Sequence, residues 1–133
     1  MVAYLKLVIC FLKTIIAIGK ISIGDIYKVG EAIIQITQPR EPCYKFGVKF
    51  GNQKAIKQFI EHGFPGTYVR VLEEGFVKTS DTFKLLKKAE NSITTAQFFK
   101  LLFSKEKDKN LIRLILDNDA LPERKRDKLK QFI

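Results

Sequence analysis

The sequence predicts a mixed β and α protein, in which a strand-rich part is followed by a small unit of three helices. Between residues 20 and 90 the apolar residues alternate or form short β-branched runs, which is typical of strands. After residue 91 they recur at helical spacing. The length of 133 residues and the hydrophobic share of 46% suit one globular domain with a modest core.

Residues 1–19 are almost wholly apolar, yet two lysines interrupt them. A membrane span needs about 20 mostly apolar residues, and a lysine near its centre costs about 2.5–3.5 kcal/mol. Lys6 and Lys13 leave only uncharged runs of strand length between and after them. A secretory cleavage pattern does not follow the basic start. We therefore expect a buried strand or core helix here, and neither a membrane anchor nor a signal peptide.

Residues 20–37 are expected to form β-structure. A Gly-Asp pair lies among alternating isoleucines, which is a hairpin-type signal, and residues 32–37 form a β-branched run. Pro39 and Pro42 follow, and neither can donate a backbone N–H to a strand ladder. Cys43 is therefore predicted to lie in a rigid loop that leaves a strand.

The next elements are a short helix and further strands. Helical spacing covers residues 54–62, and glycine and proline end the pattern. Residues 67–73 alternate as a strand does, and residues 76–86 indicate one more strand or a strand pair, broken near Ser80-Asp81.

Three helices are predicted after Asn91, over residues 92–103, 109–117 and 122–132. Their expected caps are Thr94 or Thr95, Asp108 and the first-turn proline Pro122. The predicted organisation is therefore an apolar segment at 1–19, a strand-rich domain at 20–90 and a helical unit at 91–133.

The chain is strongly basic, with 24 Lys and Arg against 14 Asp and Glu, a net charge of +10 and a pI near 9.7. Such a charge raises the expectation of an anionic partner. The excess is nevertheless spread along the whole chain, whereas nucleic-acid binders concentrate it on one face or arm. A nucleic-acid role is therefore not favoured.

Cys10 and Cys43 are the two cysteines, and they are too far apart for a metal clip. A single histidine, His62, cannot build a zinc site from histidines. A structural metal is not expected, and a reducing, cytoplasmic setting fits best.

Cys43 is the residue most suited to chemistry. Arg40 and Lys45 flank it, and nearby positive charge favours the thiolate, which is the nucleophile and the soft-metal ligand. A buried structural cysteine is the common alternative, and the local residues support both interpretations equally.

Two arginines could bind an anion. Arg40 could clamp a phosphate or carboxylate, or it could be an ordinary surface residue. Arg70 lies on an otherwise apolar strand and needs a partner, which could be Asp25, Glu73 or a bound anion.

Residues 21–51, ISIGDIYKVGEAIIQITQPREPCYKFGVKFG, resemble the MOSC domain, named for the C-terminal domain of molybdenum cofactor sulfurase. The Ile-Gly-Asp hairpin and the Gln-Pro-Arg-x-Pro-Cys sequence at residues 38–43 are similar to that family's cysteine motif. Residues 66–72 resemble the strand that follows it. Residues 92–132 are similar to the three-helix extension of stand-alone bacterial MOSC proteins.

The resemblance implies a strand-rich, β-barrel-like MOSC core that is present only in part, followed by the helical unit. The family's barrel begins well upstream of the Ile-Gly-Asp hairpin, so we expect residues 20–90 to be its C-terminal half and the chain to be N-terminally truncated.

The resemblance also implies binding of the molybdenum cofactor and reduction of N-hydroxylated compounds, with a partner reductase supplying electrons. Cys43 is then the sulfur carrier or molybdenum ligand, and Arg40, with Lys45 and Arg70, is expected to hold the cofactor's anionic groups. Pyridoxal phosphate is associated with the wider sulfurase family only, and we assign no lysine to it.

Two alternatives stay open. The C-terminal helices could bind nucleic acid through Lys125, Arg126, Lys128 and Lys130. The chain could also be an inactive fragment whose incomplete barrel exposes apolar edges.

Overall fold

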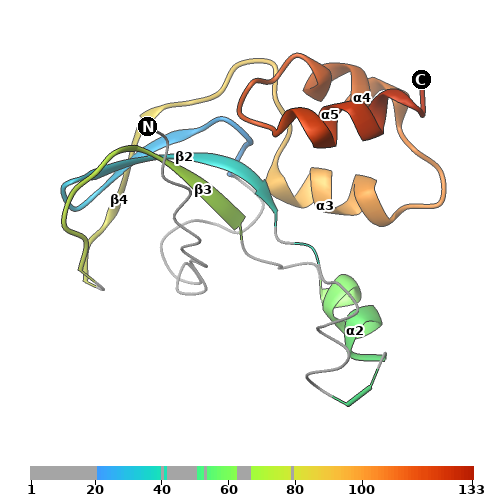
Figure 1. Ribbon diagram of the computed structural model, residues 1–133, viewed down its shortest axis with the longest axis horizontal. Helices are drawn as coiled ribbons and strands as arrows, with labels where there is room; N and C mark the ends of the chain where they lie inside the picture. Colours follow the sequence, from blue (N-terminus) through green and yellow to red (C-terminus); the bar gives the residue numbers. More distant parts are fainter. Residues whose placement is uncertain (1–20, 40, 42–50, 53, 63–66, 79) are drawn as a thin grey trace.

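The computed structural model describes residues 21–39, 41, 51–52, 54–62, 67–78 and 80–133. A four-stranded antiparallel sheet is followed by C-terminal helices, which confirms the predicted fold class (Figure 1). The elements are β1 (Ile26–Val29), β2 (Ala32–Pro39), α2 (Lys54–His62), β3 (Thr67–Glu73), β4 (Phe83–Lys87), α3 (Thr95–Phe103), α4 (Lys109–Leu116) and α5 (Glu123–Lys130). The strand order is β3-β2-β1-β4.

The β1–β2 hairpin turns at Gly30 and Glu31, one turn later than the Gly-Asp signal indicated. Val29 pairs with Ala32, and Gly30 has a φ of +56°, which glycine adopts easily. Gly24, with a φ of +99°, lies in an earlier turn that leads into β1. That earlier turn places Asp25 at the start of the sheet.

β4 is a single strand, shorter than the predicted run from 76 to 86. The residues ahead of β4 form hydrogen bonds outside the sheet. Phe76 accepts a 3.0 Å hydrogen bond at its carbonyl from Glu31 N, and Asp81 closes a turn by accepting from Lys78 N at 2.6 Å. Residues 76–78 therefore pack on the hairpin turn and stay outside the sheet.

Two of the three C-terminal helices begin at a predicted cap, Thr94 for α3 and Asp108 for α4, whereas Pro122 lies just ahead of α5 and not in its first turn. Thr94 accepts from Gln97 N at 3.1 Å while the Gln97 side chain accepts from Thr94 N, which forms a capping box. Asp108 caps α4, and Pro122 precedes the first residue of α5. In Figure 1 these helices lie together beside the sheet, whereas α2 lies apart from them.

Two hydrophobic clusters form the core. The sheet cluster consists of Ile21, Tyr27, Val29, Ile34, Ile36 and Val69, with Val71 and Phe83 packed against it. The helical cluster consists of Ile23, Ile93, Phe98, Leu101, Ile112, Ile115, Ala120, Leu121 and Leu129. Ile21 and Ile23 belong to different clusters, so the short segment ahead of β1 joins the two.

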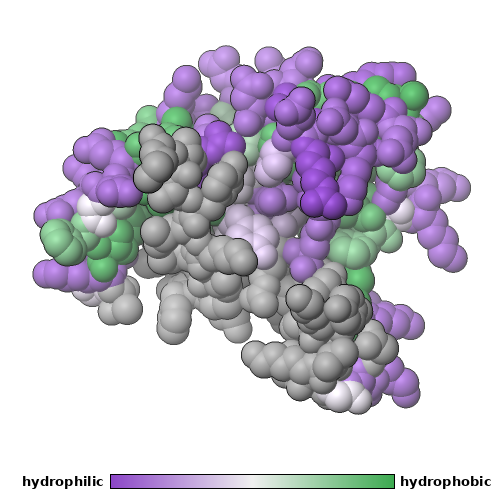
Figure 2. All heavy atoms as spheres, in the orientation of Figure 1, coloured by the Kyte–Doolittle hydropathy of each residue, from purple (hydrophilic) through white to green (hydrophobic). Residues whose placement is uncertain are grey.

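Several apolar side chains remain exposed on the two edge strands of the sheet, β3 and β4, and on the chain between them. Figure 2 shows hydrophobic surface at the end of the sheet away from the C-terminal helices, and mainly hydrophilic surface over those helices. The exposed residues of β3, β4 and their connection are Leu72, Phe76, Val77, Leu85 and Leu86. Within the described part of the chain, no helix has the length and apolar character needed to cross a bilayer.

Candidate functional site

The predicted cysteine centre is only partly within the described residues. Arg40, Cys43 and Lys45 lie outside them, whereas Arg70 lies in β3. The described residues nearest to Cys43 in the sequence are Pro39, the last residue of β2, and Glu41.

The end of β2 is held firmly against the start of β3. Thr67 Oγ1 donates to Gln38 O at 2.9 Å, and Thr37 Oγ1 donates to Tyr68 O at 2.9 Å. Both threonines are buried. Because Pro39 cannot donate to the ladder, these side-chain bonds help to fix the strand at the point where the cysteine motif begins.

Arg70 has an unsatisfied nitrogen. It lies opposite Gln35 on β2, so the two side chains share one face of the sheet. Its Nε is buried and has no hydrogen-bond partner among the described residues. Asp25 and Glu73 were predicted as possible partners of Arg70. Among the described residues, neither carboxylate forms an ion pair with it, and Asp25 pairs with Lys88 instead. A buried donor without a partner costs free energy, so Arg70 retains the capacity to bind an anion.

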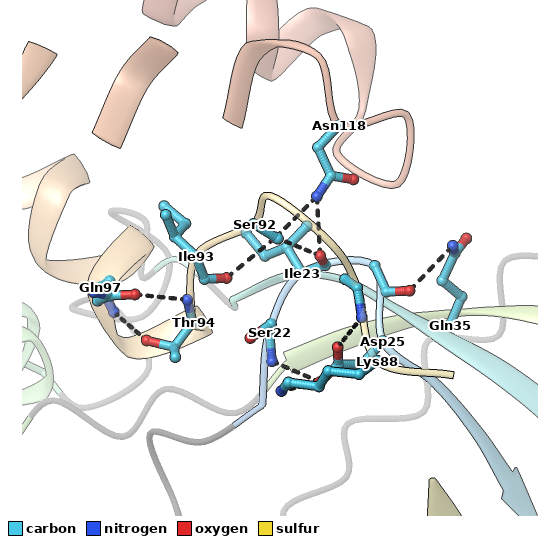
Figure 3. Close-up of polar contacts among 12 residues, drawn as sticks. Ser22, Ile23, Asp25, Gln35, Lys88, Ser92, Ile93, Thr94, Gln97 and Asn118 are labelled. Carbon is cyan, nitrogen blue, oxygen red and sulfur yellow. Dashed lines mark hydrogen bonds and ion pairs between the residues drawn. The ribbon is translucent and has the colours of Figure 1, made fainter. Parts of the chain in front are cut away.

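Asp25 is fully buried and is used for structure. Its Oδ2 accepts from Ser22 N at 2.9 Å and from Lys88 Nζ at 2.8 Å, and its Oδ1 accepts from Ala89 N at 2.8 Å. Figure 3 shows the carboxylate between these two chain segments. The aspartate of the Ile-Gly-Asp sequence therefore ties the entry of the sheet to the exit of β4.

Asn118, in the loop between α4 and α5, ties the helices to the same entry segment (Figure 3). Its Nδ2 donates to Ile23 O and to Ser92 Oγ, both at 2.9 Å, and its Oδ1 accepts from Ala120 N at 3.0 Å. Ser92 Oγ also donates to Ile23 O at 2.6 Å. The helical unit and the sheet are thus joined by polar contacts as well as by Ile23.

A shallow cavity of about 220 Å³ lies between the sheet and this loop. Lys87, Glu90 and Asp119 give its lining both signs of charge, and Gln35 adds a neutral amide. Ligand pockets usually measure about 300–1,000 Å³. The cavity is therefore too small to hold a large cofactor by itself.

No group of three or more His, Cys, Asp or Glu side chains able to hold a metal occurs among the residues that the structure describes. This finding does not extend to Cys43, which lies outside the described residues.

The structure adds one contact to the cysteine motif that the sequence did not suggest. Lys125 Nζ on α5 forms an ion pair with the carboxylate of Glu41, from 84 residues away. Opposite charge alone cannot identify such a pair at that separation. Glu41 is part of the quoted motif, and Lys125 was grouped with the basic residues of a nucleic-acid alternative.

Carboxylates partner most of that basic group. Besides the Lys125 pair, Arg126 lies 3.6 Å from Asp119 and Lys130 lies 3.1 Å from Asp127. These contacts reduce the positive charge that the C-terminal helices present, which weakens the basis for the nucleic-acid alternative.

The chain is similar to known proteins over most of its length. The model of the family described as the MOSC domain matches residues 15–84, more than half of the chain. The Bacillus subtilis protein YflK is 35% identical over 103 residues, which are 77% of this chain and 47% of YflK. A Gibberella moniliformis protein named Reductase is 38% identical over 69 residues, 51% of this chain and 12% of that protein.

The fold is similar to that of YiiM from Geobacillus stearothermophilus, whose crystal structure aligns with a TM-score of 0.77 at 24% identity. The alignment covers 87% of this chain and 60% of that one. The chain therefore spans about half of the length of YflK and less than two thirds of the length of YiiM.

Proposed function

The chain belongs to the MOSC domain family, and we propose that it binds the molybdenum cofactor, with Cys43 as sulfur carrier or molybdenum ligand. The distant fungal relative named Reductase supports an oxidoreductase role. We further propose that the reaction is the reduction of N-hydroxylated compounds, with electrons supplied by a partner reductase.

The unpartnered Nε of Arg70 is the observation that supports cofactor binding. Its buried, unpartnered Nε lies on the strand next to β2, and β2 leads into the cysteine motif. Molybdopterin carries a phosphate, and an arginine side chain recognises phosphate through charge-assisted hydrogen bonds. The free Nε of Arg70 therefore supports the binding of an anionic cofactor.

The chain's own residues would act in two ways. Arg70, together with Arg40 and Lys45 of the motif, would hold the anionic part of the cofactor. Cys43 would present its thiolate, and the fixed end of β2 would limit the conformations of the segment that carries it. The bound cofactor supplies the redox chemistry.

Molybdenum analysis of protein purified from a cofactor-producing host tests this proposal. If Cys43 is a ligand, Cys43→Ser loses the metal while the matched Cys10→Ser retains it. If Cys43 is a sulfur carrier, Cys43→Ser keeps the metal but loses the sulfur that cyanide releases. Wild-type protein without molybdenum, or a Cys43→Ser variant with unchanged molybdenum and sulfur, contradicts the proposal.

Arg70 is tested separately by cofactor affinity. Arg70→Met is expected to weaken binding about tenfold or more, because a hydrogen bond to a charged group contributes about 1.5–3 kcal/mol. Arg113→Met is the matched control, since this exposed arginine lies on α4. Equal affinity in the two variants would remove Arg70 from the site.

A further inference from the structure

Lys125 connects the helical unit to the cysteine motif. Its ammonium pairs with Glu41, which lies two residues after the end of β2 and two residues before Cys43. The side chains of Lys125 and Glu41 are only 21% and 32% exposed, so water screens this pair less than an ordinary surface pair. The contact therefore lies where it can influence the motif.

The helix that carries Lys125 is itself well anchored. Leu121, just ahead of α5, and Leu129, near its end, are buried in the helical cluster. The loop before α5 is bonded to the sheet entry through Asn118. An ammonium on such a support can restrain its partner, because little of the restraint is lost to motion of the helix.

The other ion pairs of the helical unit, Arg126 with Asp119 and Lys130 with Asp127, join residues of that unit to each other and do not reach the cysteine motif. Lys130 pairs with Asp127 on the same helix, and both side chains are more than half exposed. Such a pair stabilises the helix locally and fixes no other segment. Lys125 is therefore distinguished by its partner, which belongs to the sheet-to-cysteine segment.

We propose that Lys125 is a positioning residue that, through its ion pair with Glu41, restrains the segment that follows β2. The role of this segment in cofactor chemistry rests on the proposed function. The restraint itself does not, since it is a property of the cofactor-free chain.

Hydrogen exchange of the full, cofactor-free chain tests the restraint. In Lys125→Met, the peptide that contains Glu41 is expected to exchange up to about fivefold faster, the factor that corresponds to an ion pair at the strong end of the usual range. Glu41→Gln breaks the same pair without altering the helix and should give the same acceleration. Lys130→Met, with the same change of charge on the same helix, should leave this peptide unchanged.

The charge-reversed double variant Lys125→Glu with Glu41→Lys restores the pairing and should return the exchange rate to that of the wild type. The restraint is refuted if Lys125→Met and Glu41→Gln exchange as the wild type does, if Lys130→Met accelerates the peptide equally, or if the double variant fails to restore protection.

Molybdenum retention then tests the functional part. Lys125→Met should lose bound molybdenum more readily than Lys130→Met, and the double variant should recover it. Faster exchange together with unchanged retention would refute the positioning role. A wild-type protein that binds no molybdenum would refute the proposed function, whereas the exchange result would still decide whether the helices restrain the segment.

Discussion

At the scale of single residues, Asp25 shows how a motif residue can serve the fold. Its carboxylate accepts hydrogen bonds from two backbone amides and one ammonium, contributed by segments more than sixty residues apart. The sequence singled out the Ile-Gly-Asp pattern but could not identify these partners, because two of them lie beyond β4. The three donors around residue 25 require a charged side chain with two accepting oxygens, which a carboxylate provides.

Asp25→Asn is expected to lower the free energy of unfolding by about 2–4 kcal/mol, because the amide removes the charge and turns one acceptor into a donor. Urea denaturation measures the loss. Asp127→Asn makes the same change at an exposed site on α5 and should alter stability by less than about 0.5 kcal/mol. Similar values for the two variants would contradict the structural role of Asp25.

Tyr27 makes the free energy of unfolding depend on pH in the alkaline range. Burial, and secondarily the Asp25 carboxylate, raises the pKa of its phenol above the ordinary value of about 10. A raised folded-state pKa means that the neutral phenol contributes stability that is complete below the unfolded value. This contribution is lost as the pH rises through the folded value.

Tyr27→Phe removes that titration and keeps the ring that packs edge-on against Phe83. Between about pH 9 and pH 11, the variant should therefore lose less stability than the wild type. Chemical denaturation across this range measures both curves. Parallel curves would show that Tyr27 does not contribute to the alkaline loss.

At the scale of elements, local sequence predicted most boundaries. The predicted helix at 54–62 and strand at 67–73 match α2 and β3 residue for residue. The caps Thr94 and Asp108 were also confirmed, because capping depends on residues within one turn. β4 was placed less well, since the contact between Phe76 and Glu31 that keeps residues 76–78 out of the sheet is not local.

Thr94→Ala tests the start of α3. Loss of the capping box is expected to cost about 1 kcal/mol, seen as a lower midpoint in thermal or urea unfolding. Thr95→Ala removes the same atoms one residue later, inside the helix, where alanine is favourable. If Thr95→Ala is as destabilising as Thr94→Ala, the cap is not the source of the effect.

At the scale of the whole molecule, the sequence predicted the fold class, the helical unit and, by resemblance, the family. It could not predict how the two clusters meet, because the contacts of Asn118 and of Lys125 join residues far apart in the chain. Of the candidate site, Arg70 was placed on its strand, and its unpartnered Nε is information that only the structure provides. The roles of Arg40, Cys43 and Lys45, and the domain boundaries at 20 and 91, stay predictions.

Asn118→Ala tests the junction between sheet and helices. The side chain makes three hydrogen bonds there, and we expect a loss of about 2–3 kcal/mol in the free energy of unfolding. Asn110→Ala, at an exposed position in the first turn of α4, should change stability by less than about 0.5 kcal/mol. An equal, small effect of both substitutions would show that the junction depends on apolar packing alone.

The position of Ile23 also has a consequence for synthesis. This fully buried residue gains its cover from α3, α4 and α5, and its carbonyl bonds to a residue 95 positions later. At translation rates of about 5–20 residues per second, Ile23 is made roughly 5–20 seconds before Asn118. The entry of the sheet is therefore fully covered only after α5, the last of the three helices, has left the ribosome.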